Sequence, residues 1–112
     1  MKIKFAKYQG LGNDFIIFDA RKNDLDDLFT LNKNNIISRF CDRNFGIGAD
    51  GIILILDSSN NCFVRMRIFN SDGTEPEMCG NGIRCLISYL NNNNEVDIDI
   101  DIDIPIETKA GN

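Results

Sequence analysis

Residues 70–85 read Asn-Ser-Asp-Gly-Thr-Glu-Pro-Glu-Met-Cys-Gly-Asn-Gly-Ile-Arg-Cys. A turn-rich segment comes first, and a helical periodicity begins near Cys79. The apolar residues that recur at i, i+3, i+4 and i+7 are Ile83, Leu86, Ile87 and Leu90. A thiol at a helix N-terminus lies beside free backbone N–H groups and the positive end of the helix dipole, and both favour the thiolate. The stretch therefore predicts a reactive cysteine.

Length and composition limit the classes of protein to which the chain can belong. Its 112 residues suit one domain, and its 43% apolar content is enough for a core. The net charge of −5, without a Lys/Arg-rich patch, argues against a nucleic-acid partner. The apolar runs are far shorter than the roughly 20 residues of a membrane span. The first residues lack the apolar core of a signal peptide, so we expect a cytoplasmic protein without a membrane partner.

The chain contains no histidine and four cysteines. The absence of histidine excludes Ser-His-Asp and Cys-His catalysis and every zinc site that uses histidine. No two cysteines have the C-x-x-C spacing, which argues against a zinc ribbon and a thioredoxin-type motif. Cys41 and Cys62 lie on apolar faces, and we expect both to belong to the core, as we do Cys85.

The periodicities predict strands over residues 2–8, 15–18, 51–56, 62–69 and 96–104, with a further strand near residue 107. They predict helices over residues 32–42 and from Cys79 to about residue 90. Because the strands come in runs, the pattern indicates an α+β fold with a mostly antiparallel sheet.

Two further motifs favour structural interpretations over ligand binding. Gly46-x-Gly48-x-x-Gly51 matches the dinucleotide fingerprint in letters, but a predicted helix precedes it and a strand follows, which is the reverse of the required context. We interpret it as a glycine-rich turn in which Asp50 could brace the loop. The Asp-x-Asp series at 97–103 lacks the glycine of a calcium loop, and it fits a solvated strand face better.

The residues around Cys79 leave two interpretations open at equal weight. Free N–H groups near Gly80 and Asn81 suit a carboxylate, and the Asn81 side chain could add a contact. The alternative is a buried loop cysteine beside a glycine-rich helix start.

Three segments resemble the diaminopimelate epimerase family, in that family's order and spacing. They are residues 7–15 (KYQGLGNDF), residues 46–51 (GIGADG), and residues 69–73 (FNSDG) followed by 78–85 (MCGNGIRC). Residues 107–111 are similar to a family strand as well, so the resemblance spans essentially the whole chain.

The resemblance implies a diaminopimelate-epimerase-like α+β domain whose mostly antiparallel sheet wraps a central helix that starts near Cys79. It implies a two-base reaction without pyridoxal phosphate, metal or other cofactor. One cysteine thiolate removes the α-proton of diaminopimelate, and a second thiol on the opposite face donates a proton. This interconverts the LL and meso forms, on the route to lysine and peptidoglycan. Cys79 matches one catalytic cysteine, and Asn13, Asn70, Gly80 and Asn81 match substrate-binding positions.

The sequence departs from the family pattern in two places and in length. Position 9 is Gln where some members have His, and position 51 is Gly where some have a substrate-contacting Gln. Family members have two similar halves that each donate one cysteine, and residues 1–112 resemble the first half. Cys85 cannot serve as the second thiol because it lies on the same helix as Cys79. We therefore expect a single N-terminal domain without its C-terminal partner, inactive alone, and a homodimer is left open as a second form of association.

Other functions remain as alternatives. They are a related amino acid racemase with a different substrate, a non-catalytic truncated remnant that binds without turnover, and a redox-sensing thiol protein that uses Cys79.

Overall fold

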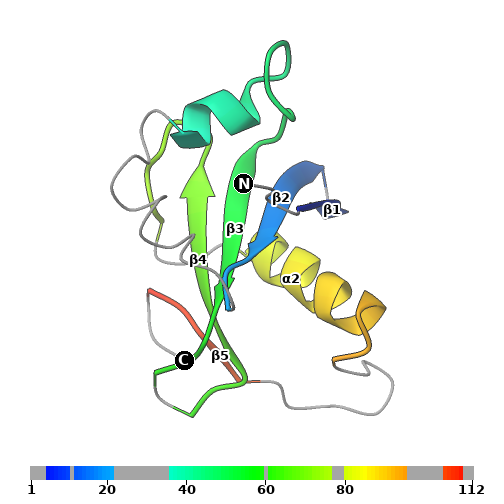
Figure 1. The fold of residues 1–112 in the computed structure, drawn as a ribbon, viewed down its shortest axis with the longest axis vertical. Coiled ribbons are helices and arrows are strands. Elements are labelled where there is room, and N and C mark those ends of the chain that lie inside the picture. The colour runs from blue at the N-terminus through cyan, green and yellow to red at the C-terminus, as the bar shows by residue number, and fades with distance from the viewer. Residues whose placement is uncertain are drawn as a thin grey trace.

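A computed structural model describes residues 5–10, 12–21, 36–59, 61–76, 80–95 and 105–109. Five strands form one sheet in the order β1-β2-β3-β4-β5, with helix α2 beside it (Figure 1). The elements are β1 (Ala6–Gly10), β2 (Asn13–Asp19), β3 (Gly51–Leu56), β4 (Val64–Asn70), α2 (Gly80–Asn92) and β5 (Ile106–Glu107). Residues 36–41 are also helical. These elements confirm the predicted α+β class.

The sheet is mixed in its strand directions. The β1–β2 and β3–β4 pairs are antiparallel, with five and six paired positions, whereas β2–β3 and β4–β5 are parallel, with five and two. Most paired positions are antiparallel, as predicted, but antiparallel and parallel strand pairs are equal in number among the described strands. Parallel neighbours need a long crossover, and the chain between β2 and β3 includes the helix at residues 36–41.

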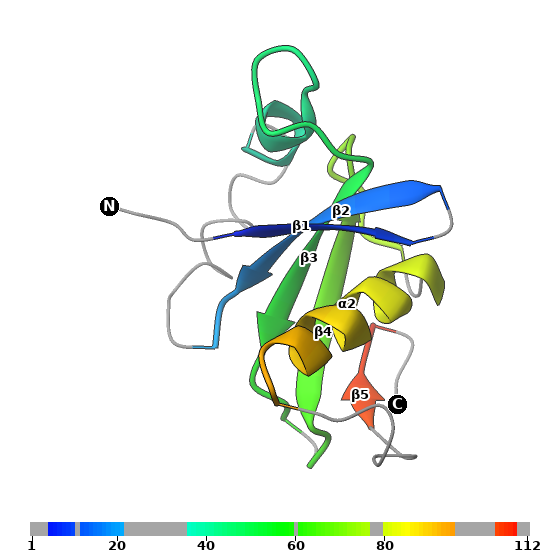
Figure 2. The same ribbon diagram turned by 90° about the vertical axis from the view of Figure 1, so that its right-hand side faces the viewer.

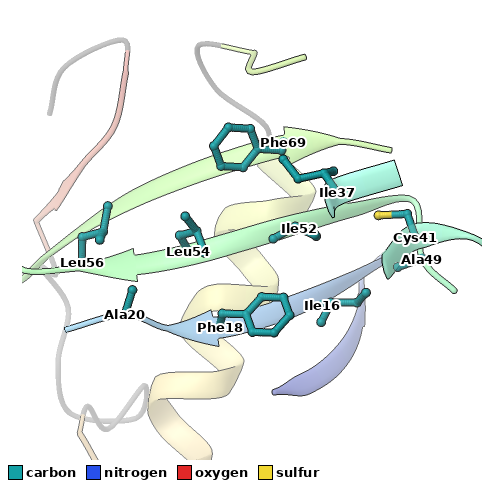
Figure 3. Close-up of a cluster of buried hydrophobic side chains, with 10 residues drawn as sticks. All are labelled: Ile16, Phe18, Ala20, Ile37, Cys41, Ala49, Ile52, Leu54, Leu56 and Phe69. Carbon is teal, nitrogen blue, oxygen red and sulfur yellow. The ribbon is translucent and has the colours of Figure 1, made fainter. Parts of the chain in front are cut away.

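Both faces of the sheet are covered, and this explains the continuous apolar runs of β2 and β3. Successive side chains of a strand point to opposite faces. Phe15 and Ile17 of β2 face α2, whereas Ile16 and Phe18 face the helix at residues 36–41. Figure 3 shows the cluster of buried side chains on the face of Ile16 and Phe18. Ile37 and Cys41, from the helix at residues 36–41, belong to this cluster. In β3 all six residues are buried.

Helix α2 lies against the other face of the sheet (Figure 2). Its buried residues include Cys85, Leu86 and Leu90, and they contact apolar side chains of β2, β3 and β4. The predicted core positions of Cys41 and Cys85 are confirmed, since the two residues are 5% and 2% exposed. Cys62, which we also expected in the core, is only half-buried and lies two residues before the start of β4. Among the described helices, none is long and apolar enough to cross a membrane.

Most of the predicted helices and strands are present in the structure, and the differences lie in the residues at which they begin and end. β3 matches the prediction at both ends, and β4 runs from residue 64 to residue 70 instead of 62 to 69. Strand β2 runs from residue 13 to residue 19 and so extends beyond the predicted strand at 15–18 at both ends. Residues 2–4, 32–35 and the predicted strand at 96–104 lie outside the described residues.

Candidate functional site

The ends of several elements meet on one side of the molecule. β2 starts at Asn13, β3 starts at Gly51, β4 ends at Asn70, and α2 starts at Gly80. Figure 2 shows the N-terminal end of α2 near the turn between β1 and β2. Cys79 immediately precedes α2 in the sequence and lies outside the described residues. The structure thus gathers predicted binding positions that are up to 68 residues apart in sequence.

Asn13 and Asn81 are in direct contact. The side-chain amide of Asn81 donates a hydrogen bond of 2.7 Å from Nδ2 to Oδ1 of Asn13. The Nδ2 of Asn13 in turn donates to Oδ2 of Asp50 at 3.3 Å. Two residues that the sequence assigned to one binding site are therefore joined, and Asp50 is the third member of the series.

Asn70 lies beside this series and is held by its own turn. Its Nδ2 donates to Oγ1 of Thr74 at 3.0 Å, and Thr74 Oγ1 donates to Oδ1 of Asp72 at 2.6 Å. Asn70 is the Cα partner of Gly51, and the Ser71 N–H donates to the carbonyl of Asp50 at 3.1 Å. Among the described residues, Asn70 is therefore connected to Asn13 through the backbone around residue 50 and not by a direct hydrogen bond.

Asp14, Arg43 and Asp50 form an ionic cluster next to Asn13. The Arg43 guanidinium lies 2.9 Å from Oδ1 of Asp14 and 3.2 Å from Oδ1 of Asp50. The hydrogen bond from Arg43 holds the pKa of Asp14 well below its ordinary value, and the Asp50 N–H adds to this effect, while partial burial opposes it. Asp14 and Asp50 thus share the Arg43 cation, and Nζ of Lys7 lies 3.5 Å from Oδ2 of Asp14 as a second cation.

Two glycines at the site differ in the space around them. A Cβ at Gly51 would lie 2.5 Å from the carbonyl oxygen of Phe69 on the neighbouring strand, so the close approach of β3 and β4 requires glycine there. A Cβ at Gly80 would meet nothing within 4 Å among the described residues. In the described part of the chain, the surface over the start of α2 is therefore open at Gly80, as a site for a small ligand requires.

The two buried thiols, Cys41 and Cys85, are not suited to acid–base chemistry. Burial raises the pKa of Cys41 to about 11, and this residue packs in the core between the sheet and residues 36–41. Cys85 is buried on the sheet-facing side of α2. At the open end of the sheet the described groups are amides and an ion-paired cluster, which can bind and orient a polar ligand.

Two residues of the cluster were not predicted from the sequence. Asp14 directly follows Asn13, and this adjacency to a predicted binding residue could have identified it as part of the site. Arg43 gives no such signal, because its partners Asp14 and Asp50 are fixed only by the tertiary fold. The suggestion that Asp50 braces the loop is confirmed by its hydrogen bonds to Asn13 and Asp14.

Comparisons with known proteins agree on one family. The sequence model described as diaminopimelate epimerase matches residues 5–112. The chain is 72% identical over 111 residues to the diaminopimelate epimerase of Prochlorococcus marinus (strain NATL1A), covering 99% of this chain and 38% of that protein. It is 57% identical over 90 residues to the diaminopimelate epimerase of Nostoc punctiforme, covering 80% of this chain and 31% of the relative.

Solved structures show the same fold. The chain superimposes on a Bacillus anthracis phenazine biosynthesis protein of the PhzF family with a TM-score of 0.71 at 25% identity, covering 99% of this chain and 34% of that one. A putative phenazine biosynthesis protein from Clostridium difficile gives a TM-score of 0.51 at 17% identity, covering 97% and 37%. The chain thus spans less than two fifths of the relatives that it matches. Over residues 5–112, which include every predicted site residue, the chain belongs to the diaminopimelate epimerase family.

Proposed function

We propose that this chain supplies one half of the active site of a cofactor-independent epimerase that interconverts LL- and meso-diaminopimelate. The observation that carries the proposal is the convergence of Asn13, the Asn70 turn and the start of α2 at one open end of the sheet. The family membership supports the substrate class. Within this half, Cys79 is the acid–base thiol, and Asn13, Asn70, Gly80 and Asn81 bind the substrate.

The chemistry needs a base together with stabilisation of negative charge. The α-proton of an amino acid is weakly acidic, so a positioned base alone does not suffice. The first N–H groups of a helix have no partner within that helix, and those at the start of α2 are suited to the substrate's α-carboxylate. The Cys79 thiolate takes the α-proton, and the electron pair left on carbon is delocalised toward the carboxylate. A second thiol then gives a proton to the opposite face, and the centre is inverted.

The second thiol must come from outside residues 1–112. Cys85 lies within α2, only six residues after Cys79 in the sequence, and is buried against the sheet. We therefore propose that a C-terminal domain, which would correspond to the additional length of the relatives, supplies it. This chain alone should then bind diaminopimelate weakly and turn it over negligibly. The proposed place of the reaction is cytoplasmic lysine and peptidoglycan-precursor synthesis.

Thiol alkylation tests the role of Cys79. Limited iodoacetamide treatment followed by peptide mass spectrometry should modify Cys79 faster than the other cysteines, and diaminopimelate should slow this modification. Cys62 is the internal control, because it is half-buried and lies outside the proposed site. Equal protection of both residues, or no protection of Cys79 at saturating ligand, would contradict the proposal. Protection by other amino acids but not by diaminopimelate would favour the alternative racemase.

Hydrogen exchange at the α-carbon tests whether this half is sufficient. In deuterated water, mass spectrometry should detect no rapid deuterium incorporation into diaminopimelate with this chain alone. Adding the separately produced C-terminal part of the Prochlorococcus marinus relative should restore incorporation, and a Cys79→Ser variant of this chain should not. Fast epimerisation by the isolated chain would show that the second thiol is unnecessary.

A further inference from the structure

Asp14 and Asp50 form a reciprocal pair that joins the starts of β2 and β3. The N–H of Asp14 donates to Oδ2 of Asp50 at 3.0 Å, and the N–H of Asp50 donates to Oδ1 of Asp14 at 3.0 Å. Two adjacent carboxylates would repel one another, but the Arg43 guanidinium contacts both. Each carboxylate is thus fixed by the backbone of the other residue as well as by a shared cation.

This pair determines how the neighbouring amides are oriented. An ionised carboxylate can only accept hydrogen bonds, whereas a side-chain amide has one donor end and one acceptor end. Because Asp50 Oδ2 accepts from Asn13, the amide of Asn13 must turn Nδ2 toward Asp50 and Oδ1 away from it. Oδ1 of Asn13 then requires a donor, which is Nδ2 of Asn81.

The same series decides which end of Asn81 remains available. Its Nδ2 is engaged with Asn13, so its Oδ1 is the end that can accept from a ligand. Asn81 is half-buried in the first turn of α2, next to Gly80, where the surface is open. Among the described residues, none donates a hydrogen bond to this carbonyl oxygen.

We propose that Asp50 is a positioning residue, which with Asp14 and Arg43 fixes the amides of Asn13 and Asn81 so that Asn81 presents a hydrogen-bond acceptor to the ligand. The ligand group that fits this oxygen is a donor, and the ammonium group of an amino acid is the strongest available. The free N–H groups of α2 suit a carboxylate, so the two sites together match the two charged groups of an amino acid. The assignment of the ligand group rests on the proposed function, whereas the orientation of the amides does not.

The test uses Asp50→Ala, which removes the carboxylate that accepts from the side chain of Asn13. Without this acceptor nothing distinguishes the two ends of the Asn13 amide, so the orientations of Asn13 and Asn81 should no longer be fixed. Asp57→Ala is the matched control, because Asp57 is an exposed carboxylate directly after the other end of β3.

Nuclear magnetic resonance of the full chain gives a readout that needs no ligand. In the parent, the Asn13 Nδ2 protons and the Asp14 amide proton point at the same oxygen, so a nuclear Overhauser effect between them should be strong. The effect should be strongly reduced in Asp50→Ala and retained in Asp57→Ala. Its absence in the parent, or its persistence at full strength in Asp50→Ala, would overturn the proposal. The parent measurement decides by itself if Asp50→Ala does not fold.

Binding of meso-diaminopimelate, titrated by the same spectra, tests the choice of ligand group. We expect Asp50→Ala to weaken binding on the order of tenfold, since the acceptor for a charged donor is no longer held in place. Asp57→Ala should bind as the parent does. Loss of the Overhauser effect with unchanged affinity would overturn the ammonium assignment. If even the parent does not bind while the Overhauser effects are as expected, the proposed function fails and the positioning role of Asp50 stands.

Discussion

Asp14 combines an ion pair with a backbone contact that holds two strands together. It ends the GND sequence after the β1–β2 turn, and its carboxylate accepts from Arg43 and from the Asp50 N–H. Adjacency to Asn13 could have pointed to Asp14. Arg43 could not be identified, because a surface arginine after a helix has no local pattern that reveals a partner 29 residues earlier.

The depressed pKa of Asp14 predicts how stability depends on pH. A carboxyl whose pKa is lower in the folded than in the unfolded chain stabilises the fold above its ordinary pKa, and this contribution is lost as the pH falls. We expect urea unfolding of the parent to show a loss of stability below about pH 4. In Asp14→Asn the loss should be smaller, so the two stability curves should converge toward pH 2.

Arg43→Met should reduce the same pH dependence, because the guanidinium is the largest cause of the low pKa of Asp14. Curves for the parent and Asp14→Asn that stay parallel from pH 6 to pH 2 would contradict this account.

At the scale of elements, β4 and the segment after it are connected by a shielded ion pair. Arg67 donates from Nε and a terminal nitrogen to the two oxygens of Glu75, at 2.9 and 2.8 Å, and both side chains are at most 14% exposed. The guanidinium also lies 4.9 Å from the ring centroid of Phe69. The pair thus holds Glu75, in the segment that follows Asn70, against the sheet.

Arg67→Lys should therefore be costly although the charge is kept. A lysine cannot make the bidentate contact with the Glu75 carboxylate. We therefore expect a loss of about 1–2 kcal/mol in the free energy of unfolding, measured with urea at pH 7. Arg65→Lys on the same strand is the control. Arg65 is 40% exposed and lies 3.9 Å from Glu107, so its replacement should cost clearly less. Equal losses in the two variants would show that the Arg67 pair has no special role.

The predictability of the elements follows from how local their signals are. β3 and α2 could be predicted because an apolar run and a 3.6-residue period are complete within their own residues. The pairing of β2 with β3 could not, since parallel neighbours are joined by a crossover and no turn specifies them. Asn13 was predicted as a binding residue from its motif, while its place at the start of a strand depends on that same long-range pairing.

In the whole molecule, stability should be distributed around β3. This strand is paired on both sides and covered on both faces. β1 and β5 each have one partner among the described strands. Native-state hydrogen exchange at pH 7 should show β3 amides exchanging on the order of a hundredfold more slowly than those of β1. Comparable rates in the two strands would mean that the described sheet opens as one unit.

The burial of β3 on every side also has a consequence during synthesis. Gly51–Leu56 is an uncharged, proline-free segment rich in β-branched residues, which is the composition that favours cross-β aggregation when it is exposed. It leaves the ribosome before β4, the antiparallel partner that will cover its second edge. Until that hairpin closes, intermolecular association competes with folding. Substitutions that delay closure should thus reduce the yield of native chain through inclusion bodies, even where the folded protein loses little stability.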